Sequence, residues 1–334
     1  MDYLTFSNTT YLQSMKTRNV CLLGGSGFVG RYVTEALTKQ GITVRVLTRM
    51  RERAKHLLVL PTVEVVEANV HNEAELVAQF HDCDAVINLI GVLHDGKGRE
   101  SFAAVHMDIA HDVVNACIKA KVKRLLHMSA LNADPEAPSQ YLRSKGEAEV
   151  IVRAVMHKLA VTIFRPSVIF GPEDNFLNRF AALIKLFPII PLASAHTRFQ
   201  PVFVEDVAKV VVKSLDQISA HGNTYEICGP HVYTLRELMQ FTSALIQKSR
   251  SIIDLPPAMA KLQASVLEIM PGKLLTQDNL RSMQVDSVCK CDFETQFGFI
   301  PTSLAAIAPR YLTGQTPRGR YQIFRHRAGR SLRH

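Results

Sequence analysis

In the first half of the chain, apolar and polar positions alternate between a strand-like pattern and a helix-like pattern. Short apolar runs rich in β-branched residues alternate with amphipathic stretches of helical length. The runs predicted as strands are 19–23, 42–48, 63–66, 85–90, 124–128 and 160–165. Because strands that alternate with helices build a parallel sheet through right-handed crossovers, the pattern predicts an α/β fold with an open, doubly wound sheet. Ligands of such sheets bind at the carboxyl ends of the strands.

The pattern changes after Pro166, where loops rich in proline, glycine and asparagine precede several helices. Helices are expected near 204–216, 234–247 and 257–270, with short strands near 200–203 and 224–227. This half predicts a smaller, mainly helical C-terminal lobe over the edge of the ligand crevice. The expected division is an N-terminal extension (1–17), a first domain (18–165), a second lobe interleaved with it (166–313) and a basic tail (314–334).

The apolar content of 47% in 334 residues is enough to bury a sizeable core, which excludes disorder along the whole chain. The most apolar stretch, 181–195, is interrupted by Lys185, Pro188 and Pro191, so we expect no membrane-spanning helix. The N-terminus has no basic segment followed by an apolar one, as a secretory signal would. We expect a cytoplasmic protein, with a peripheral position at the inner face of the cytoplasmic membrane as a further option.

The net charge of the whole chain is +9, and the basic residues are concentrated at the C-terminus. Residues 295–334 contain seven arginines and no acidic residue. Such a tail could contact anionic lipid, nucleic acid or an acidic partner subunit, or it could simply be solvated. Of these partners, nucleic acid is the one we do not expect. On the helix expected at 257–270, Met259, Leu262, Val266 and Met270 share a face, which we interpret as core packing, with lipid or partner contact as the alternative.

Cysteines and histidines show no metal-binding spacing. The six cysteines, at positions 21, 83, 117, 228, 289 and 291, include no CxxC pair, which predicts reduced thiols in a reducing compartment. Cys289 and Cys291 form a single CxC, interpreted as two ordinary thiols. The thirteen histidines contain no HExxH, so no metal site is expected. His94 follows the fourth strand and is the histidine placed to reach a substrate.

A glycine-rich turn follows the first predicted strand and opens the first predicted helix. Gly24, Gly27 and Gly30 form GxxGxxG, in which the first glycine permits a tight turn, the second a close approach to a pyrophosphate and the third close packing of helix on sheet. Free N–H groups at the helix start stabilise the anion. The loop residues expected to bind the cofactor are Gly24, Ser26, Gly27, Phe28, Val29 and Gly30.

The residue at the end of the second strand distinguishes the two nicotinamide dinucleotides. Sites that prefer NAD usually have Asp or Glu there, to accept a hydrogen bond from the adenosine ribose. This chain has Arg49, with Arg51 or Arg53 as support, and an arginine can bind a 2′-phosphate in a bidentate manner. NADP(H) is therefore the preferred cofactor, and NAD(H) is the alternative.

Tyr141 and Lys145 are four residues apart on the helix expected after the fifth strand, so they share one face of it. A lysine ammonium beside a phenol lowers the phenol's pKa and makes it a usable proton donor or acceptor during hydride transfer. The same lysine can hold the nicotinamide ribose. The pair is a predicted catalytic and cofactor-binding unit.

These motifs together resemble the extended and atypical short-chain dehydrogenase/reductase superfamily, over residues 18–313. The chain is most similar to the nucleotide-binding accessory subunit of respiratory complex I and its bacterial relatives. The segments that carry the resemblance are 24–30, 86–94, 105–106, 128–134, 141–145, 165–171, 172–180, 202–208 and 275–280.

The resemblance implies a Rossmann-type domain that binds NADP(H) or NAD(H). It places Ile90 and Gly91 beside the adenosine, Tyr141 and Lys145 at the nicotinamide, and the segment from Pro166 to Val168 near the carboxamide. Its complex I branch is associated with a structural cofactor where the subunit meets the membrane arm.

Three positions depart from the superfamily pattern. The proton-relay asparagine of the fourth helix appears as His106, and the serine pair closing the fifth strand is reduced to Ser129 and Ala130. If Ala130 stands at the carbonyl-polarising position, the lost donor costs about a hundredfold in rate; in the other alignment Ser129 serves that role. Asn69 replaces a frequent aspartate and can still bond adenine.

Three functions are consistent with the sequence. The first is an NADP(H)-binding protein with a structural cofactor and weak or no turnover, in contact with a respiratory complex or another membrane-associated protein. The second is an active oxidoreductase or epimerase that uses Tyr141, Lys145 and Ser129 on a nucleotide-sugar, isoprenoid or quinone-like substrate. The third is an NADP(H)-sensing regulator.

Overall fold

The computed structural model describes residues 16–269 and 273–313. Most of the predicted N-terminal extension and the whole basic tail therefore lie outside the described residues. Residues 16 and 17 of the extension are described, and Thr17 donates from its N and Oγ1 to Asp216 Oδ1 at 3.0 and 2.7 Å.

Seven parallel strands form the central sheet, in the order β11-β6-β5-β4-β1-β2-β3. Six of them were expected from the apolar runs of the first half, and the doubly wound fold of the Rossmann type is confirmed. The seventh, β11, was expected as a short strand of the second lobe and instead pairs with β6 at the edge of the main sheet. Their bounds are β1 (Asn19–Leu23), β2 (Thr43–Thr48), β3 (Val63–Glu67), β4 (Ala85–Asn88), β5 (Arg124–Met128), β6 (Ala160–Pro166) and β11 (Thr224–Ile227).

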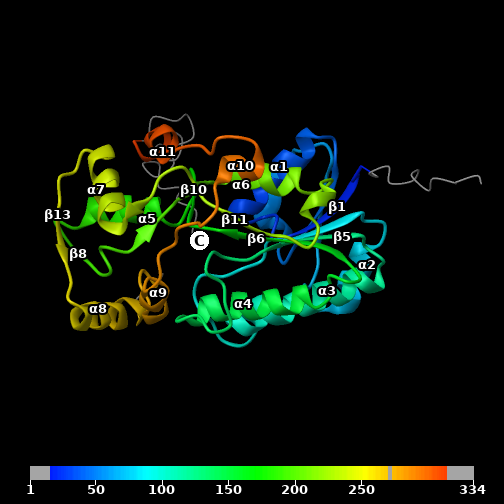
Figure 1. Ribbon diagram of the computed structural model, residues 1–334, viewed down its shortest axis with the longest axis horizontal. Helices are drawn as coiled ribbons and strands as arrows, with labels where there is room; N and C mark the ends of the chain where they lie inside the picture. Colours follow the sequence, from blue (N-terminus) through cyan, green and yellow to red (C-terminus); the bar gives the residue numbers. More distant parts are fainter. Residues whose placement is uncertain (1–15, 270–272, 314–334) are drawn as a thin grey trace, which may run out of the picture.

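Helices cover both faces of this sheet (Figure 1). One face carries α1 (Phe28–Lys39) and α6 (Val204–Lys213), whose apolar side chains pack with strand residues such as Leu22 into one core. The opposite face carries α2 (Glu73–Phe80), α3 (Ile109–Lys119) and α4 (Gln140–Arg153) over a second core. Both faces of the strands are thus buried, as their nearly continuous apolar runs require.

The second lobe joins short strand pairs to several helices around a third core. The chain is interleaved, because α6 and β11 return to the main sheet between segments of the second lobe. The strand pairs are β7 (Ile169–Phe170) with β10 (Val202–Phe203), β8 (Ile189–Leu192) with β13 (Ser251–Asp254), and β9 (Arg198–Phe199) with β12 (Tyr233–Thr234). The helices are α5 (Leu177–Leu186), α7 (Leu235–Leu245), α8 (Pro257–Ile269), α9 (Gln277–Ser282) and α11 (Leu304–Leu312). Helix α10 (Phe293–Phe297) packs its two phenylalanines into the core of α1 and α6 on the main sheet.

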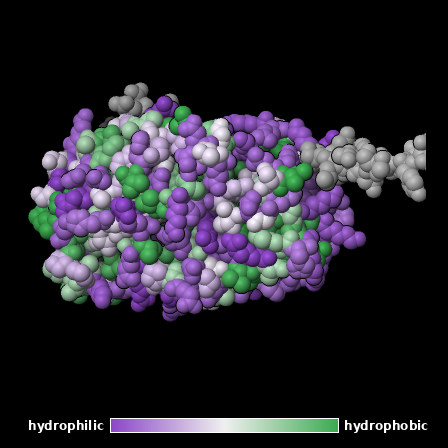
Figure 2. All heavy atoms as spheres, in the orientation of Figure 1, coloured by the Kyte–Doolittle hydropathy of each residue, from purple (hydrophilic) through white to green (hydrophobic). Residues whose placement is uncertain are grey.

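Helix α8 corrects one sequence prediction. The face formed by Met259, Leu262 and Val266 is 55–67% exposed, so it is not a core-packing face, while Ala260 and Ala264 are buried. Met270, the fourth residue predicted on this face, lies outside the described residues. Small alanines let the helix approach the lobe closely, which leaves the larger side chains outside. Figure 2 shows hydrophobic residues scattered among polar ones over the visible face, including the end formed by the second lobe. Within residues 16–269 and 273–313, no helix is long and apolar enough to cross a membrane.

A disulfide between Cys228 and Cys289 corrects the prediction that these cysteines are free thiols. The two residues are 61 positions apart, and their Cα atoms are 6.0 Å apart. Cys228 directly follows β11, and Cys289 lies on an extended segment that leads to α10. Sequence spacing could not reveal the pair, because only the folded path of the chain brings the two segments together. Cys291 remains a free, exposed thiol.

The position of α4 depends on Gly146, where the helix passes very close to a loop. A Cβ at this position would lie 2.3 Å from the carbonyl carbon of Asp134 and 2.5 Å from the nitrogen of Pro135. Both are backbone atoms, so a side chain would force the helix away from the sheet.

We predict that Gly146→Ala destabilises the protein by about 1–3 kcal/mol through this overpacking. The sign of the change in stability distinguishes overpacking from helix propensity, because propensity alone would favour alanine by up to about 1 kcal/mol. Urea unfolding would measure the difference, with Glu147→Ala on the next position as the control that changes stability by less than about 0.5 kcal/mol. Equal stability of Gly146→Ala and the wild type would contradict the close contact.

Candidate functional site

The loop between β1 and α1 forms a tight turn against the sheet. The Gly27 N–H donates to the Gly24 carbonyl at 3.0 Å, and Gly24 has a φ of +78°, which favours glycine. A Cβ on Gly30 would lie 2.2 Å from the same carbonyl oxygen. Helix α1 can therefore begin directly on the loop only because residue 30 has no side chain.

The start of α1 offers unpaired backbone donors to an anion. Gly27 is the N-cap and makes no side-chain cap hydrogen bond. The N–H groups of Phe28, Val29 and Gly30 have no acceptor one turn earlier within the helix, and the helix dipole adds positive potential at this end. Half-buried Ser26 lies in the same loop. The predicted pyrophosphate residues thus come together at one helix terminus, as an anion site requires.

Arg49 and Asn69 lie past the ends of two paired strands. Arg49 directly follows β2 and is exposed, and Asn69 lies two residues after β3, its hydrogen-bonded neighbour. The Asn69 Oδ1 accepts from the His71 N–H at 3.2 Å, and its own N–H donates to Glu75 Oε2 at 2.8 Å. The placement of Arg49 leaves its guanidinium available to a ligand at this edge.

The ends of β4 and β6 bring the other predicted cofactor residues to the same edge. The Asn88 side chain accepts from the Ile90 N–H at 3.1 Å and turns the chain away from β4. At Gly91 a Cβ would lie 3.0 Å from Lys145 Nζ, so the Gly91 backbone lies against the lysine. Pro166 ends β6, and the Val168 carbonyl accepts from Val202 N at 3.0 Å.

Helix α4 carries Tyr141 and Lys145, and hydrogen bonds at its first turn hold it in place. Ser139 caps its first turn through Leu142 N, and the Asp278 carboxylate of α9 accepts from the N–H groups of Gln140 and Tyr141 at 2.7 and 3.0 Å. Asp278 thus caps the helix from the second lobe. Sequence reasoning missed this role, because nothing in the local pattern places residue 278 beside residue 140.

Further along α4, an ion pair ties the helix to β6. The Glu149 carboxylate accepts from Arg165 Nε and Nη2, both at 2.7 Å, and is only 3% exposed. This hydrogen bonding raises the pKa of Arg165. Such bidentate geometry fixes orientation as well as distance.

The Lys145 ammonium bonds to backbone at the carboxyl ends of the sheet. Its Nζ donates to the carbonyls of Met128 and Ile90, at 3.1 and 3.4 Å. Burial lowers the pKa of Lys145 to about 8, partly offset by the charge of Glu149. The lysine therefore links the ends of β4 and β5 to α4, next to the predicted nicotinamide position.

Tyr141 does not have the lowered pKa that its spacing from Lys145 predicted. Burial raises the pKa of Tyr141 to about 12, so the phenol keeps its proton at neutral pH. Its ring packs edge-on to Phe102 and His106, with centroids 5.9 and 5.8 Å apart. The cause of the shift is desolvation of the charged phenolate in this surrounding.

His106 lies on a π-helical turn (Ala103–Asp108) and is a buried, neutral histidine. Its Nε2 accepts from the Val92 N–H at 3.1 Å, which places the ring proton on Nδ1, 2.8 Å from Ser144 Oγ. Ser144 Oγ in turn donates to the Tyr141 carbonyl at 2.9 Å. Burial, followed by the Lys145 charge, lowers the pKa of His106 to about 2.

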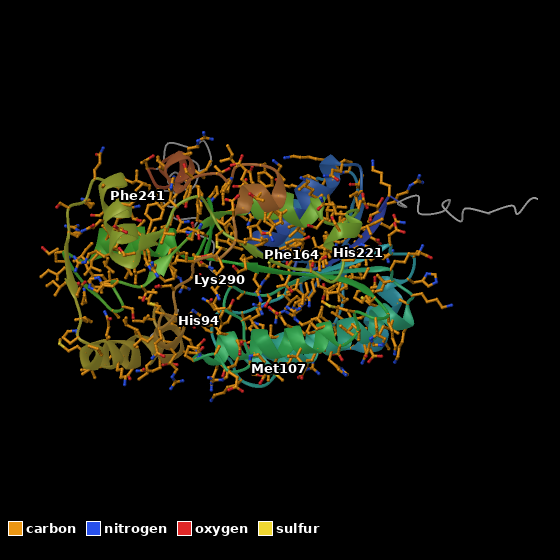
Figure 3. All side chains as sticks on the ribbon, viewed as in Figure 1. His94, Met107, Phe164, His221, Phe241 and Lys290 are labelled. Atoms are coloured by element: carbon orange, nitrogen blue, oxygen red, sulfur yellow. A yellow bond between two sulfur atoms is a disulfide. The ribbon has the colours of Figure 1, made fainter. Side chains whose placement is uncertain are left out.

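Ser129 and His94 offer polar atoms that nothing in the described part of the chain satisfies. The Ser129 Oγ and both ring nitrogens of His94 are buried and have no hydrogen-bond partner there. Ser129 is held through its N–H, which donates to the Phe164 carbonyl at 2.7 Å. Figure 3 shows His94 between the two lobes. Burial, then the charges of Arg179 and Lys273, lowers the pKa of His94.

We predict that His106→Asn makes the protein less sensitive to acid. In the unfolded chain this histidine binds a proton below about pH 6.5, whereas in the folded protein buried His106 stays neutral. Protonation therefore stabilises the unfolded state, and the free energy of unfolding falls as pH falls. Between about pH 6.5 and 5, urea unfolding should show the wild type losing about 1–2 kcal/mol more than His106→Asn. The exposed His157→Asn should lose as much as the wild type, and parallel losses in all three proteins would contradict the assignment.

Comparison with known proteins agrees with this geometry. The model of the NAD dependent epimerase/dehydratase family matches residues 20–228. The chain is 28% identical over 316 residues to the NADH-ubiquinone oxidoreductase 40 kDa subunit of Neurospora crassa, covering 93% of this chain and 83% of the relative. It is 30% identical over 292 residues to the mouse NADH dehydrogenase [ubiquinone] 1 alpha subcomplex subunit 9, covering 85% and 76%.

Among solved structures, an NADPH-dependent quinone oxidoreductase from Escherichia coli, complexed with NADPH, shares the fold. The TM-score is 0.72 at 19% identity, over 88% of this chain and 99% of that one. The family match covers more than half of the chain and includes the glycine loop, Tyr141 and Lys145. The chain belongs to the NAD dependent epimerase/dehydratase family and is related to the complex I subunits that the sequence resembled.

Proposed function

We propose that the protein binds NADP(H) as a structural cofactor with weak or no turnover, and that it contacts a respiratory complex or another membrane-associated protein. The observation that carries this proposal is the network around Lys145. Its ammonium is bonded to two backbone carbonyls, while Tyr141 keeps its proton and His106 stays neutral. These groups hold strand ends and helix together, as a structural nucleotide pocket requires.

The residues present fit a nicotinamide dinucleotide. The uncapped start of α1 and the glycines of the loop from Gly24 to Gly30 would hold the pyrophosphate. Ile90 and Gly91 would contact the adenosine, and Lys145 would bond the nicotinamide ribose. Pro166 and Val168 would contact the carboxamide. When bound, the nicotinamide ring supplies a hydride donor or acceptor.

The preference for NADP(H) over NAD(H) rests on Arg49. Its exposed position past β2, where a carboxylate would otherwise bond the ribose hydroxyls, favours a 2′-phosphate. Arg51 begins the following 3-10 helix (Arg51–Leu57) and adds a second positive charge at this edge.

Partnership with a respiratory complex rests on the two complex I relatives named above. The exposed apolar side chains of α8 are compatible with such a partner, and a peripheral position at the inner face of the cytoplasmic membrane follows from the same proposal.

A second candidate is an active oxidoreductase or epimerase, which the unsatisfied Ser129 hydroxyl favours. In that function Ser129 would orient a substrate carbonyl and the neutral Tyr141 would donate a proton to the developing alkoxide. Lys145 would offset the negative charge left on the phenolate.

We predict that Arg49→Ala weakens NADPH binding about tenfold or more and leaves NADH binding nearly unchanged, because it removes a charged contact to the 2′-phosphate alone. Isothermal titration of both nucleotides would measure this. Lys39→Ala, at the far end of α1, removes the same charge as a control. An equal loss for NADPH and NADH would refute the 2′-phosphate assignment.

Tyr141→Phe separates the structural function from the enzymatic one. We predict that the variant keeps bound nucleotide and has the wild-type melting temperature, and that neither protein oxidises NADPH with added carbonyls or quinones. Absorbance of NADPH would follow turnover, with Tyr225→Phe as a matched control. A wild-type activity that falls about a hundredfold or more only in Tyr141→Phe would establish the enzyme instead.

A further inference from the structure

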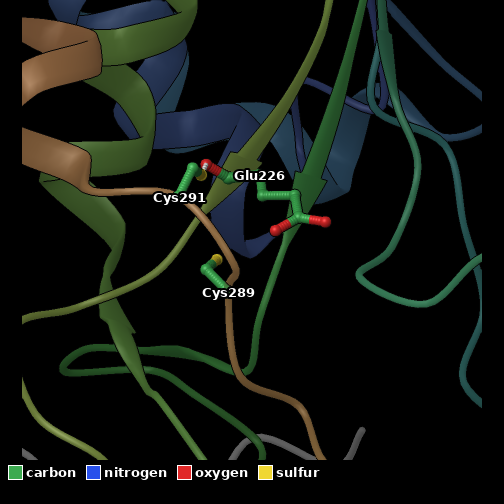
Figure 4. A group of neighbouring side chains, drawn as sticks. All are labelled: Glu226, Cys289 and Cys291. Atoms are coloured by element: carbon green, nitrogen blue, oxygen red, sulfur yellow. Dashed lines mark hydrogen bonds between the residues drawn. The ribbon is translucent and has the colours of Figure 1, made fainter.

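Three sulfurs and a carboxylate meet at the end of β11. The ligand atoms of Glu226, Cys289 and Cys291 all lie within 4.8 Å of one another (Figure 4). The Cys289 sulfur is bonded to that of Cys228. Figure 4 shows the three side chains converging from β11 and from the segment before α10. None of these residues takes part in the proposed nucleotide site.

Hydrogen bonds hold the two cysteine segments side by side independently of the disulfide. The Gln200 side chain accepts from Cys289 N at 3.1 Å and donates to the carbonyl of Gly229, the neighbour of Cys228, at 2.7 Å. Lys290 N donates to Glu226 Oε2 at 2.9 Å. The cluster should therefore stay assembled when the disulfide is reduced.

The charges around the cluster leave room for a cation. Arg153 and Arg165 line the adjacent hollow, but both are bonded to Glu149. Lys290 also lines the hollow and is exposed. The two arginines beside the cluster are thus already paired with a carboxylate, which leaves Glu226 to serve as a metal ligand.

Thiolates with one carboxylate are a ligand set that suits zinc. Zn²⁺ takes four ligands in a tetrahedron, with sulfurs at about 2.3 Å and hence about 3.8 Å from each other. Three of the four candidate ligand atoms already lie within 4.8 Å of one another, so closing around an ion needs only a small shift.

We propose that, after reduction of the Cys228–Cys289 disulfide by a dithiol, the protein binds one Zn²⁺ through Cys228, Cys289, Cys291 and Glu226. In the reduction, the dithiol is oxidised to its own disulfide, and its two electrons and two protons convert the Cys228–Cys289 bond into two thiols. Binding of the ion then releases three protons, one from each thiol. The oxidised protein keeps only two of the four ligands.

The test uses the full chain in two redox states. The protein is reduced with a phosphine, transferred without oxygen into buffer, and titrated with zinc chloride against a chromogenic chelator; an untreated sample is titrated in parallel. We expect one tightly bound ion per reduced chain and binding at least about a hundredfold weaker in the oxidised chain. Equal binding in both states would overturn the proposal.

Variants identify the ligands. Cys291→Ser, at an exposed position, should weaken zinc binding at least about tenfold, and Glu226→Gln should do the same. Cys83→Ser removes a thiol from another part of the fold and should bind zinc as the wild type does. Cobalt substitution gives a second readout, since thiolate-to-cobalt charge-transfer absorption should decrease in Cys291→Ser only. An equal loss in Cys83→Ser and Cys291→Ser would place the bound metal elsewhere.

Discussion

The close approach of helix α1 to the turn before it is the constraint on which the ligand edge depends. A side chain at Gly30 would meet the Gly24 carbonyl at 2.2 Å, so the helix can begin at the end of β1 only with glycine there. β1 lies inside the sheet, between β4 and β2. The helix start therefore points its free N–H groups over the point where the strand order reverses, which is where dinucleotides bind in doubly wound sheets.

Lys145 determines the other half of this edge. An ammonium buried this deeply is costly unless it is bonded, and the carbonyls of Ile90 and Met128 supply the bonds. The same contacts hold α4 against two strand ends, so the residue that a dehydrogenase uses to bind ribose is also a structural support. The backbone bonds of Lys145 therefore give the Tyr141–Lys145 pair a structural role in this fold that does not depend on turnover.

Local patterns revealed most of the main sheet and the glycine loop, because strand periodicity and turn chemistry depend on neighbouring residues. Features that depend on the folded path were missed. The Cys228–Cys289 disulfide, the capping of α4 by Asp278 and the outward face of α8 each join or orient segments far apart in the chain. The raised pKa of Tyr141 was missed for a related reason, since burial is set by Phe102 and His106 and not by the spacing to Lys145.

One residue connects the nucleotide edge with the cysteine cluster. Ser167 lies between Pro166 and Val168. Its N–H donates to the carbonyl of Ile227, the residue before Cys228, at 3.0 Å. Its Oγ donates to the Ser287 carbonyl at 2.8 Å. Both cysteine segments are thus bonded to the loop expected beside the nicotinamide. Because interiors are closely packed, a rearrangement of the sulfurs would alter the packing of this loop as well.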